Sequence, residues 1–97
     1  MSTTRAQFRQ SRLGELNQLE GEIDKLQRRA RIVGYDEESQ HHERMEMLAK
    51  KRDEVAAMLE RLADAGADDW QELAGKIDQA ISDLEASTRA IMANLRT

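Results

Sequence analysis

Three stretches of this sequence repeat apolar residues at alternating intervals of three and four positions. In the first stretch, the repeated residues are Leu16, Leu19, Ile23, Leu26, Ala30 and Val33. A helix with this spacing carries one narrow apolar stripe, and that stripe is stable only when another helix covers it. The spacing therefore predicts that this part of the chain is a helix that pairs with other helices.

The middle and last stretches repeat the same spacing. The middle stretch contains Met45, Leu48, Arg52, Val55, Leu59 and Leu62. The last stretch contains Trp70, Leu73, Ile77, Ala80, Ile81, Leu84, Ile91 and Leu95, with Ser87 and Thr88 as an interruption. We expect Arg52 to lay its stem along apolar surface, and Met45, Met47, Met58 and Met92 to fill the core. Asp69 and Glu72 have capping-box spacing, which predicts Trp70 at the first helical position.

The composition agrees with an all-α fold. The 97 residues include no proline and one each of Trp, Tyr and Phe, which leaves nothing to break a helix or to build a sheet. We expect one domain over residues 1–97, with helices over 4–33, 36–65 and 69–96. Helices of nearly equal length, roughly 42–45 Å, favour an antiparallel three-helix bundle or hairpin of coiled-coil type.

The stretch "GYDEESQHHER", residues 34–44, decides between two architectures. Gly34 suits the end of one helix, and Asp36, Glu37 and Glu38 suit the start of the next, so a turn over 34–38 is predicted. Alternatively, one helix of about 60 residues continues through this stretch and folds back only at Gly66. A second chain then covers the stripe from Leu16 to Val33, and the protein is a dimer.

The same stretch contains the two histidines, and their spacing bears on metal binding. Glu37 and His41 are four residues apart, as are Glu38 and His42. A zinc site needs three or four converging ligands, whereas adjacent histidines point in different directions on a helix. We therefore interpret the stretch as a solvated polar belt and expect no metal and no cofactor.

The sequence offers little for catalysis or for nucleic acid. It has no cysteine, no glycine-rich phosphate loop and no recognisable Ser, His and Asp arrangement. The basic clusters "RRAR" and "KKR" have acidic residues nearby, and the pI near 5.2 opposes phosphate binding. We expect neither an enzyme nor a nucleic-acid-binding protein.

The start of the chain is basic and weakly amphipathic. Residues 1–31 carry seven basic and four acidic residues, a net charge of +3, and residues 32–97 carry a net charge of −7. Opposite charge can hold these helices together within one bundle, or the start can bind anionic lipid. The candidate membrane face consists of Arg5, Phe8, Arg9, Arg12 and Leu13. No apolar run reaches the ~18 residues of a membrane span, and no secretory signal is recognised.

Three segments together resemble a group of small bacterial proteins predicted to be coiled coils. They are "LGELNQLEGEIDKL", "RMEMLAKKRDEVAAMLERL" and "DDWQELAGKIDQAISDLEAS". The matching residues are Ile23, Asp24, Lys25 and Leu26 in the first segment, and Trp70, Leu73, Ala80 and Leu84 in the last. Gly34 departs from the glycine-free middle of such proteins. The resemblance implies a helical fold and a bacterial, cytoplasmic setting, and it implies no particular activity.

These observations favour a non-enzymatic coiled-coil protein that binds itself or a partner helix. The expected interaction seam consists of Leu16, Leu19, Ile23, Leu26 and Val33. The alternative is a protein of the membrane surface that uses the basic start. Trp70 is interpreted as a core anchor that packs near Leu62.

Overall fold

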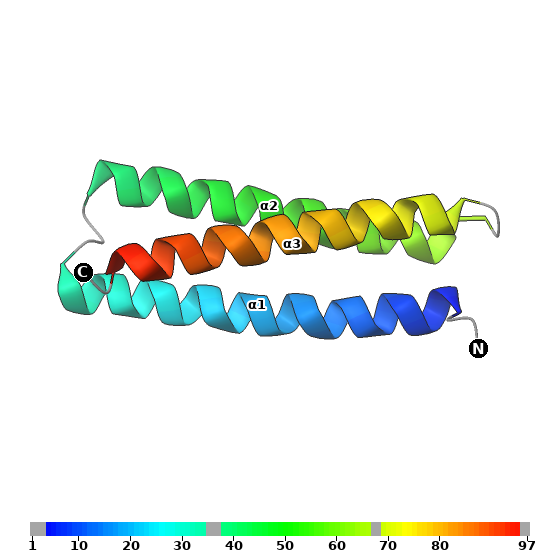
Figure 1. Cartoon of the computed structure of the whole chain (residues 1–97), viewed down its shortest axis with the longest axis horizontal. Coiled ribbons are helices and arrows are strands. Elements are labelled where there is room, and N and C mark those ends of the chain that lie inside the picture. Colours follow the sequence, from blue (N-terminus) through cyan, green and yellow to red (C-terminus); the bar gives the residue numbers. More distant parts are fainter. Residues whose placement is uncertain (1–3, 35–37, 67–68, 96–97) are drawn as a thin grey trace.

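The computed structural model describes residues 4–34, 38–66 and 69–95, which form three helices. Helix α1 spans Arg5–Val33, α2 spans Ser39–Asp64 and α3 spans Trp70–Leu95. Each helix runs antiparallel to the one before it (Figure 1), and each packs against both others. The bundle measures 48 × 23 × 15 Å. The prediction of an all-α antiparallel three-helix bundle is confirmed.

The bundle has two ends that we name by one residue each. The Trp70 end contains the start of α1, the end of α2 and the start of α3. The Gly34 end contains the end of α1, the start of α2 and the end of α3 (Figure 1). The described part of the chain begins at the Trp70 end, with α1, and ends at the Gly34 end, with α3.

Local signals fix the limits of α1. At its start, the Thr4 hydroxyl accepts a hydrogen bond from the Gln7 backbone N–H, and the Gln7 side chain accepts one from the Thr4 N–H, which completes a capping box. At its end, Gly34 has φ 82° and ψ 16° and donates its N–H to carbonyls of the last turn. Glycine adopts this left-handed conformation without steric cost.

The helix therefore does not continue through the polar stretch. Helix α1 ends at Val33 and α2 begins at Ser39, after Glu38 in an extended conformation. The alternative of one helix of about 60 residues is wrong, as is the predicted start of α2 at residue 36. The predicted turn residues 35–37 lie outside the described ranges.

The end of α2 also differs from the prediction. The helix ends at Asp64, and the next residue, Ala65, is extended at φ −70° and ψ 144°. Gly66 does not adopt a positive φ, so it is not a left-handed cap of the kind that Gly34 forms. Its carbonyl instead accepts hydrogen bonds from the N–H groups of Asp69 and Trp70, both at 3.2 Å. Helix α3 begins at Trp70, as predicted.

The predicted stripes meet along the axis of the bundle and form its core. The fully or nearly fully buried apolar side chains include Leu16, Leu19, Ile23, Leu26, Leu48, Val55, Leu59, Leu62, Ile77, Ile81, Leu84, Ile91 and Leu95. Burying one such side chain contributes about 1.5–3 kcal/mol. Met45, Met58 and Met92 are half-buried against this core as expected, whereas Met47 is exposed.

Two polar residues are buried in the core. The sequence predicted an interruption of the apolar stripe at Thr88 and a polar surface at His41. Thr88 is 3% exposed and donates its hydroxyl hydrogen to the Leu84 carbonyl oxygen at 2.7 Å, so it continues the apolar stripe. His41 is 7% exposed. It lies seven residues before Leu48, at the same heptad position. The polar-belt interpretation is therefore wrong for His41 and holds for His42, which is exposed.

Candidate functional site

The large apolar side chains that remain exposed among the described residues gather at the Gly34 end. Ile32 is 77% exposed, Met47 is 58% exposed and Val33 is 40% exposed. Ile32 and Val33 lie in the last turn of α1, and Met47 lies in the first half of α2. Single exposed apolar residues are ordinary on a protein surface, but Met47 also borders a hollow.

This hollow, which we call the Met47 groove, lies between α2 and α3 and has a volume of about 210 Å³. Its lining consists of Arg44, Met47, Leu48, Ser87, Ala90, Ile91 and Asn94. Leu48 and Ile91 are buried core residues, so the core itself forms the floor. Ser87 and Ala90 are small, so the backbone of α3 is accessible to a large neighbour. A further apolar side chain placed here would extend the core.

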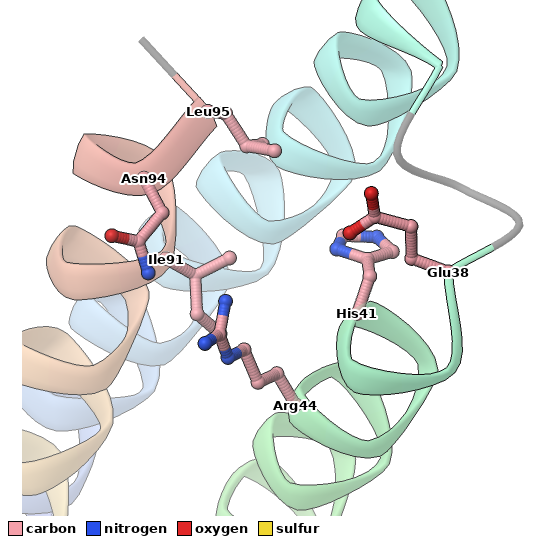
Figure 2. A pocket seen from close by; sticks show the side chains of 6 residues that line it. All are labelled: Glu38, His41, Arg44, Ile91, Asn94 and Leu95. Carbon is pink, nitrogen blue, oxygen red and sulfur yellow. The ribbon is translucent and has the colours of Figure 1, made fainter. Parts of the chain in front are cut away.

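A second hollow of about 140 Å³ adjoins the Met47 groove and continues to the end of the bundle (Figure 2). Glu38, which precedes α2, borders it together with His41 and Arg44 of α2, and Ile91, Asn94 and Leu95 border it from α3. The two hollows share Arg44, Ile91 and Asn94. Together they form one shallow channel between α2 and α3 at the Gly34 end.

One basic side chain, Arg44, borders the Met47 groove, and a second, Lys51, lies next to its end. The Lys51 ammonium group donates a hydrogen bond at 3.0 Å to the hydroxyl of Ser87, which borders the groove from α3. Arg44 borders both hollows and forms no ion pair with any residue that the structure describes. No carboxylate from the described ranges borders the Met47 groove. The groove is therefore apolar at its floor and basic at its edge.

The candidate membrane face at the start of α1 is used within the bundle. Phe8 is buried and its ring lies 6.1 Å from the Trp70 ring, centroid to centroid. The Arg12 guanidinium lies 4.4 Å from the Phe8 ring centroid and bonds the Asp78 carboxylate at 2.6 Å. That hydrogen bond raises the pKa of Arg12 above its ordinary value. Leu13 is half-buried against the core.

The other two arginines of that face bond the end of α2. Arg9 donates its Nε–H to the Leu59 carbonyl oxygen at 3.0 Å, and Arg5 donates to the Ala65 carbonyl oxygen. Leu59 lies in the last two turns of α2 and Ala65 follows its last residue, so both arginines lie near the helix C-terminus, which carries partial negative charge. The basic start of the chain therefore stabilises the C-terminal end of α2.

The expected interaction seam is mostly covered. Leu16, Leu19, Ile23 and Leu26 are buried by α2 and α3, and Val33 alone is exposed. Trp70 packs against the core cluster, which includes Leu62 and Phe8, and its ring pairs with that of Phe8. Sequence reasoning placed Met47 in the core. It missed the groove, although Met47 lies directly beside Leu48 and so cannot share its helical face.

Three other hollows on the surface lack an exposed large apolar side chain. One of about 450 Å³ at the Trp70 end is bordered by Arg5 and Arg9, which are bonded to α2. One of about 240 Å³ between α1 and α3 has an acidic edge with Glu15, Glu22 and Glu85. One of about 280 Å³ lies between α1 and α2 beside His41 and His42. The Met47 groove is thus the apolar candidate.

The two histidines do not belong to a metal centre in the part of the chain that is described. Their ring centroids are 6.4 Å apart. Residues 4–34, 38–66 and 69–95 contain no group of three or more His, Cys, Asp or Glu residues that could hold a metal ion. Glu37, the spacing partner of His41, lies outside these ranges. Over the same ranges, no helix is long and apolar enough to cross a membrane.

The described residues form a small three-helix bundle with an apolar groove between α2 and α3. Comparison with protein-family models, with curated proteins and with solved structures gives no match to this chain. Its function must therefore be argued from the geometry.

Proposed function

We propose that this chain is a non-enzymatic interaction protein that accepts a helix of a partner protein in the Met47 groove. The observation that carries this proposal is an exposed methionine beside a hollow whose floor is the bundle core. The core of the bundle is formed by the chain itself, so the seam of α1 is occupied. The available apolar surface is accordingly between α2 and α3, rather than at Leu16, Leu19, Ile23 and Leu26.

The shape of the groove favours a helix as the occupant. Two packed helices leave a channel between them that a third helix can fill, as in helix-in-groove recognition. Ser87 and Ala90 border the channel, and small residues allow a neighbouring backbone to approach closely. A docked helix would convert the three-helix bundle into a four-helix arrangement with coiled-coil packing. The resemblance to small bacterial coiled-coil proteins supports a bacterial, cytoplasmic setting for this partnership.

A photo-crosslinking amino acid at position 47 tests the proposal in cells that express the chain. The matched control carries the same amino acid in place of Ala57, which is exposed on the same helix and borders none of the hollows described above. We expect a discrete protein adduct from position 47 and none from position 57. The adduct would be identified by mass spectrometry and rebuilt from two purified proteins. Equal adducts at both positions, or none at position 47, would contradict the proposal.

A further inference from the structure

We infer that the helix accepted by the Met47 groove is acidic, with two carboxylates about one heptad apart on either side of an apolar residue. This inference rests on the proposed function and deepens it by naming the chemistry of the partner. The carboxylates would pair with Arg44 and Lys51, and the apolar residue would contact Met47.

The spacing on α2 carries the first step. Arg44, Met47 and Lys51 follow one another at intervals of three and four residues, so they lie along the same side of the helix. The two cations are one heptad apart, and the exposed methionine lies between them. A partner helix that follows the groove would meet a cation, an apolar side chain and a second cation in that order.

The positions of the two cations carry the second step. The hydrogen bond from Lys51 to Ser87 places the ammonium group between α2 and α3, beside Ser87 at one end of the groove. Figure 2 shows Arg44 extending from α2 toward Ile91 of α3, where both border the neighbouring hollow. An apolar helix without acidic groups would cover these cations without pairing them, at a cost in desolvation. A carboxylate on the partner would remove that cost.

The acidic residues nearby lie outside the Met47 groove. Glu38 borders the adjoining hollow together with Arg44, but it does not border the groove itself. Helix α3 has no carboxylate after Glu85, so its side of the groove carries none. On α2, Glu43 and Glu54 lie on the other side of Met47 from Arg44 and Lys51, in projection down the helix axis. They do not border the groove. The chain as a whole has a net charge of −4, so the basic edge is a local departure from an acidic surface.

The same charges argue against a second copy of this chain as the occupant. A two-fold dimer would place the same groove of both copies face to face. Arg44 and Lys51 of one copy would then approach Arg44 and Lys51 of the other, with no carboxylate in either groove to separate them. Like charges in contact disfavour such a dimer.

Three synthetic helical peptides with the same apolar pattern test the inference with the whole 97-residue chain. They carry Glu, Gln or Lys at two positions seven residues apart, with leucine between these positions. Affinity is measured by calorimetry, and the site is located from the methyl resonances of the methionines. We expect the Glu peptide to bind about tenfold more tightly than the Gln peptide and the Lys peptide to bind least. We expect the Met47 methyl signal to shift more than that of Met92.

Charge reversal provides the matched variants. The double variant Arg44→Glu and Lys51→Glu should bind the Glu peptide more weakly, and the Lys peptide more tightly, than the original chain does. Lys50→Glu changes the adjacent exposed position on α2 and should leave both affinities unchanged. All three positions are at the surface or half-exposed, and far-UV circular dichroism with a urea titration confirms that each variant is folded.

Several outcomes would overturn the inference. They are equal binding of the Glu and Lys peptides, binding of none of them, an unchanged preference in the charge-reversed variant, or a two-chain mass by light scattering that falls on charge reversal. Pelleting with vesicles of anionic lipid that depends on Arg44 and Lys51 would also overturn it. If crosslinking from position 47 succeeds while the peptide preference fails, the docking function stands and the acidic class of partner falls.

Discussion

The two ends of this bundle consist of the same three helices, but they differ in how many of their side chains form contacts within the bundle. At the Trp70 end, aromatic rings meet over the core, and three arginines of α1 bond groups on α2 and α3. At the Gly34 end, large apolar side chains remain exposed and Arg44 has no ionic partner among the described residues. One end uses its side chains for internal contacts, whereas the other keeps side chains available for a partner.

The difference shows that a heptad pattern determines which helices pair, but not which side-chain contacts form at the ends of the bundle. The apolar stripes continue from one end to the other, from Phe8, Leu62 and Ala74 to Ala30, His41 and Leu95. The hydrogen bonds, ion pairs and ring contacts of residues outside the stripes are what differ between the two ends. Removing or adding such contacts should therefore affect the two ends differently.

Phe8→Ala should have the largest effect, because it removes the ring that joins Trp70, Arg12 and the core. We expect a loss of about 3 kcal/mol in the free energy of unfolding, measured by urea titration. Met47→Ala, at the other end, removes an exposed side chain and should change stability by less than about 0.5 kcal/mol. Comparable losses in the two variants would show that the ends do not differ in this way.

Gly34→Ala tests the turn that makes the open end. A Cβ at Gly34 meets nothing within 4 Å, so the only penalty comes from φ 82°. We expect a loss of about 1 kcal/mol in the free energy of unfolding.

Gly21→Ala is the matched control for that variant. Gly21 lies within α1, and its Cβ would also meet nothing within 4 Å. Alanine there should raise the free energy of unfolding by about 0.5–1 kcal/mol, because it favours the helix. Changes of the same sign in the two variants would refute the role of Gly34 as a left-handed cap.

Arg12→Met tests whether the arginines of the Trp70 end stabilise the bundle. The variant keeps an apolar stem but loses the bond to Asp78 and the charge over the Phe8 ring. Because the ion pair is partly exposed, we expect a loss of only about 1 kcal/mol. A double-mutant cycle with Asp78→Asn separates the ion pair from the ring contact. A coupling energy of zero would mean that the ion pair contributes nothing.

Much of this architecture follows from the sequence, because heptad spacing and capping residues are local. The stripes identified the core, Gly34 marked the end of α1 and Trp70 marked the start of α3. The partners of Arg12 and Arg9 could not be predicted, since Asp78 and Leu59 are 66 and 50 residues away.

The two misplaced polar residues of the core show a different limit. Thr88 is buried because its hydroxyl bonds a carbonyl one turn earlier, and this bond allows a polar residue in an apolar stripe. His41 could have been placed by counting seven residues back from Leu48. Its polar side chain predicted a surface position, whereas its heptad position predicted the core, and the structure places it in the core. The Met47 groove depends on how α2 and α3 pack, and no single stripe encodes it.

His41→Leu should have the smallest effect and should sharpen the comparison of the ends. His41 is buried beside Leu95 and Ile91 at the Gly34 end, and its imidazole ring makes no hydrogen bond with a described residue. Leucine at this heptad position would continue the stripe of Leu48 and Leu62. We expect the free energy of unfolding to rise by about 0.5 kcal/mol. His42→Leu, at the adjacent exposed position, should leave stability within about 0.5 kcal/mol of the original chain.

If His41→Leu instead destabilises the bundle by more than about 1 kcal/mol, the histidine is a required packing element. The Gly34 end would then be as specifically built as the Trp70 end. If the free energy of unfolding rises as expected, leucine at position 41 is more stabilising than the histidine that is present. The Gly34 end is then not optimised for stability, as expected for a surface that binds a partner helix.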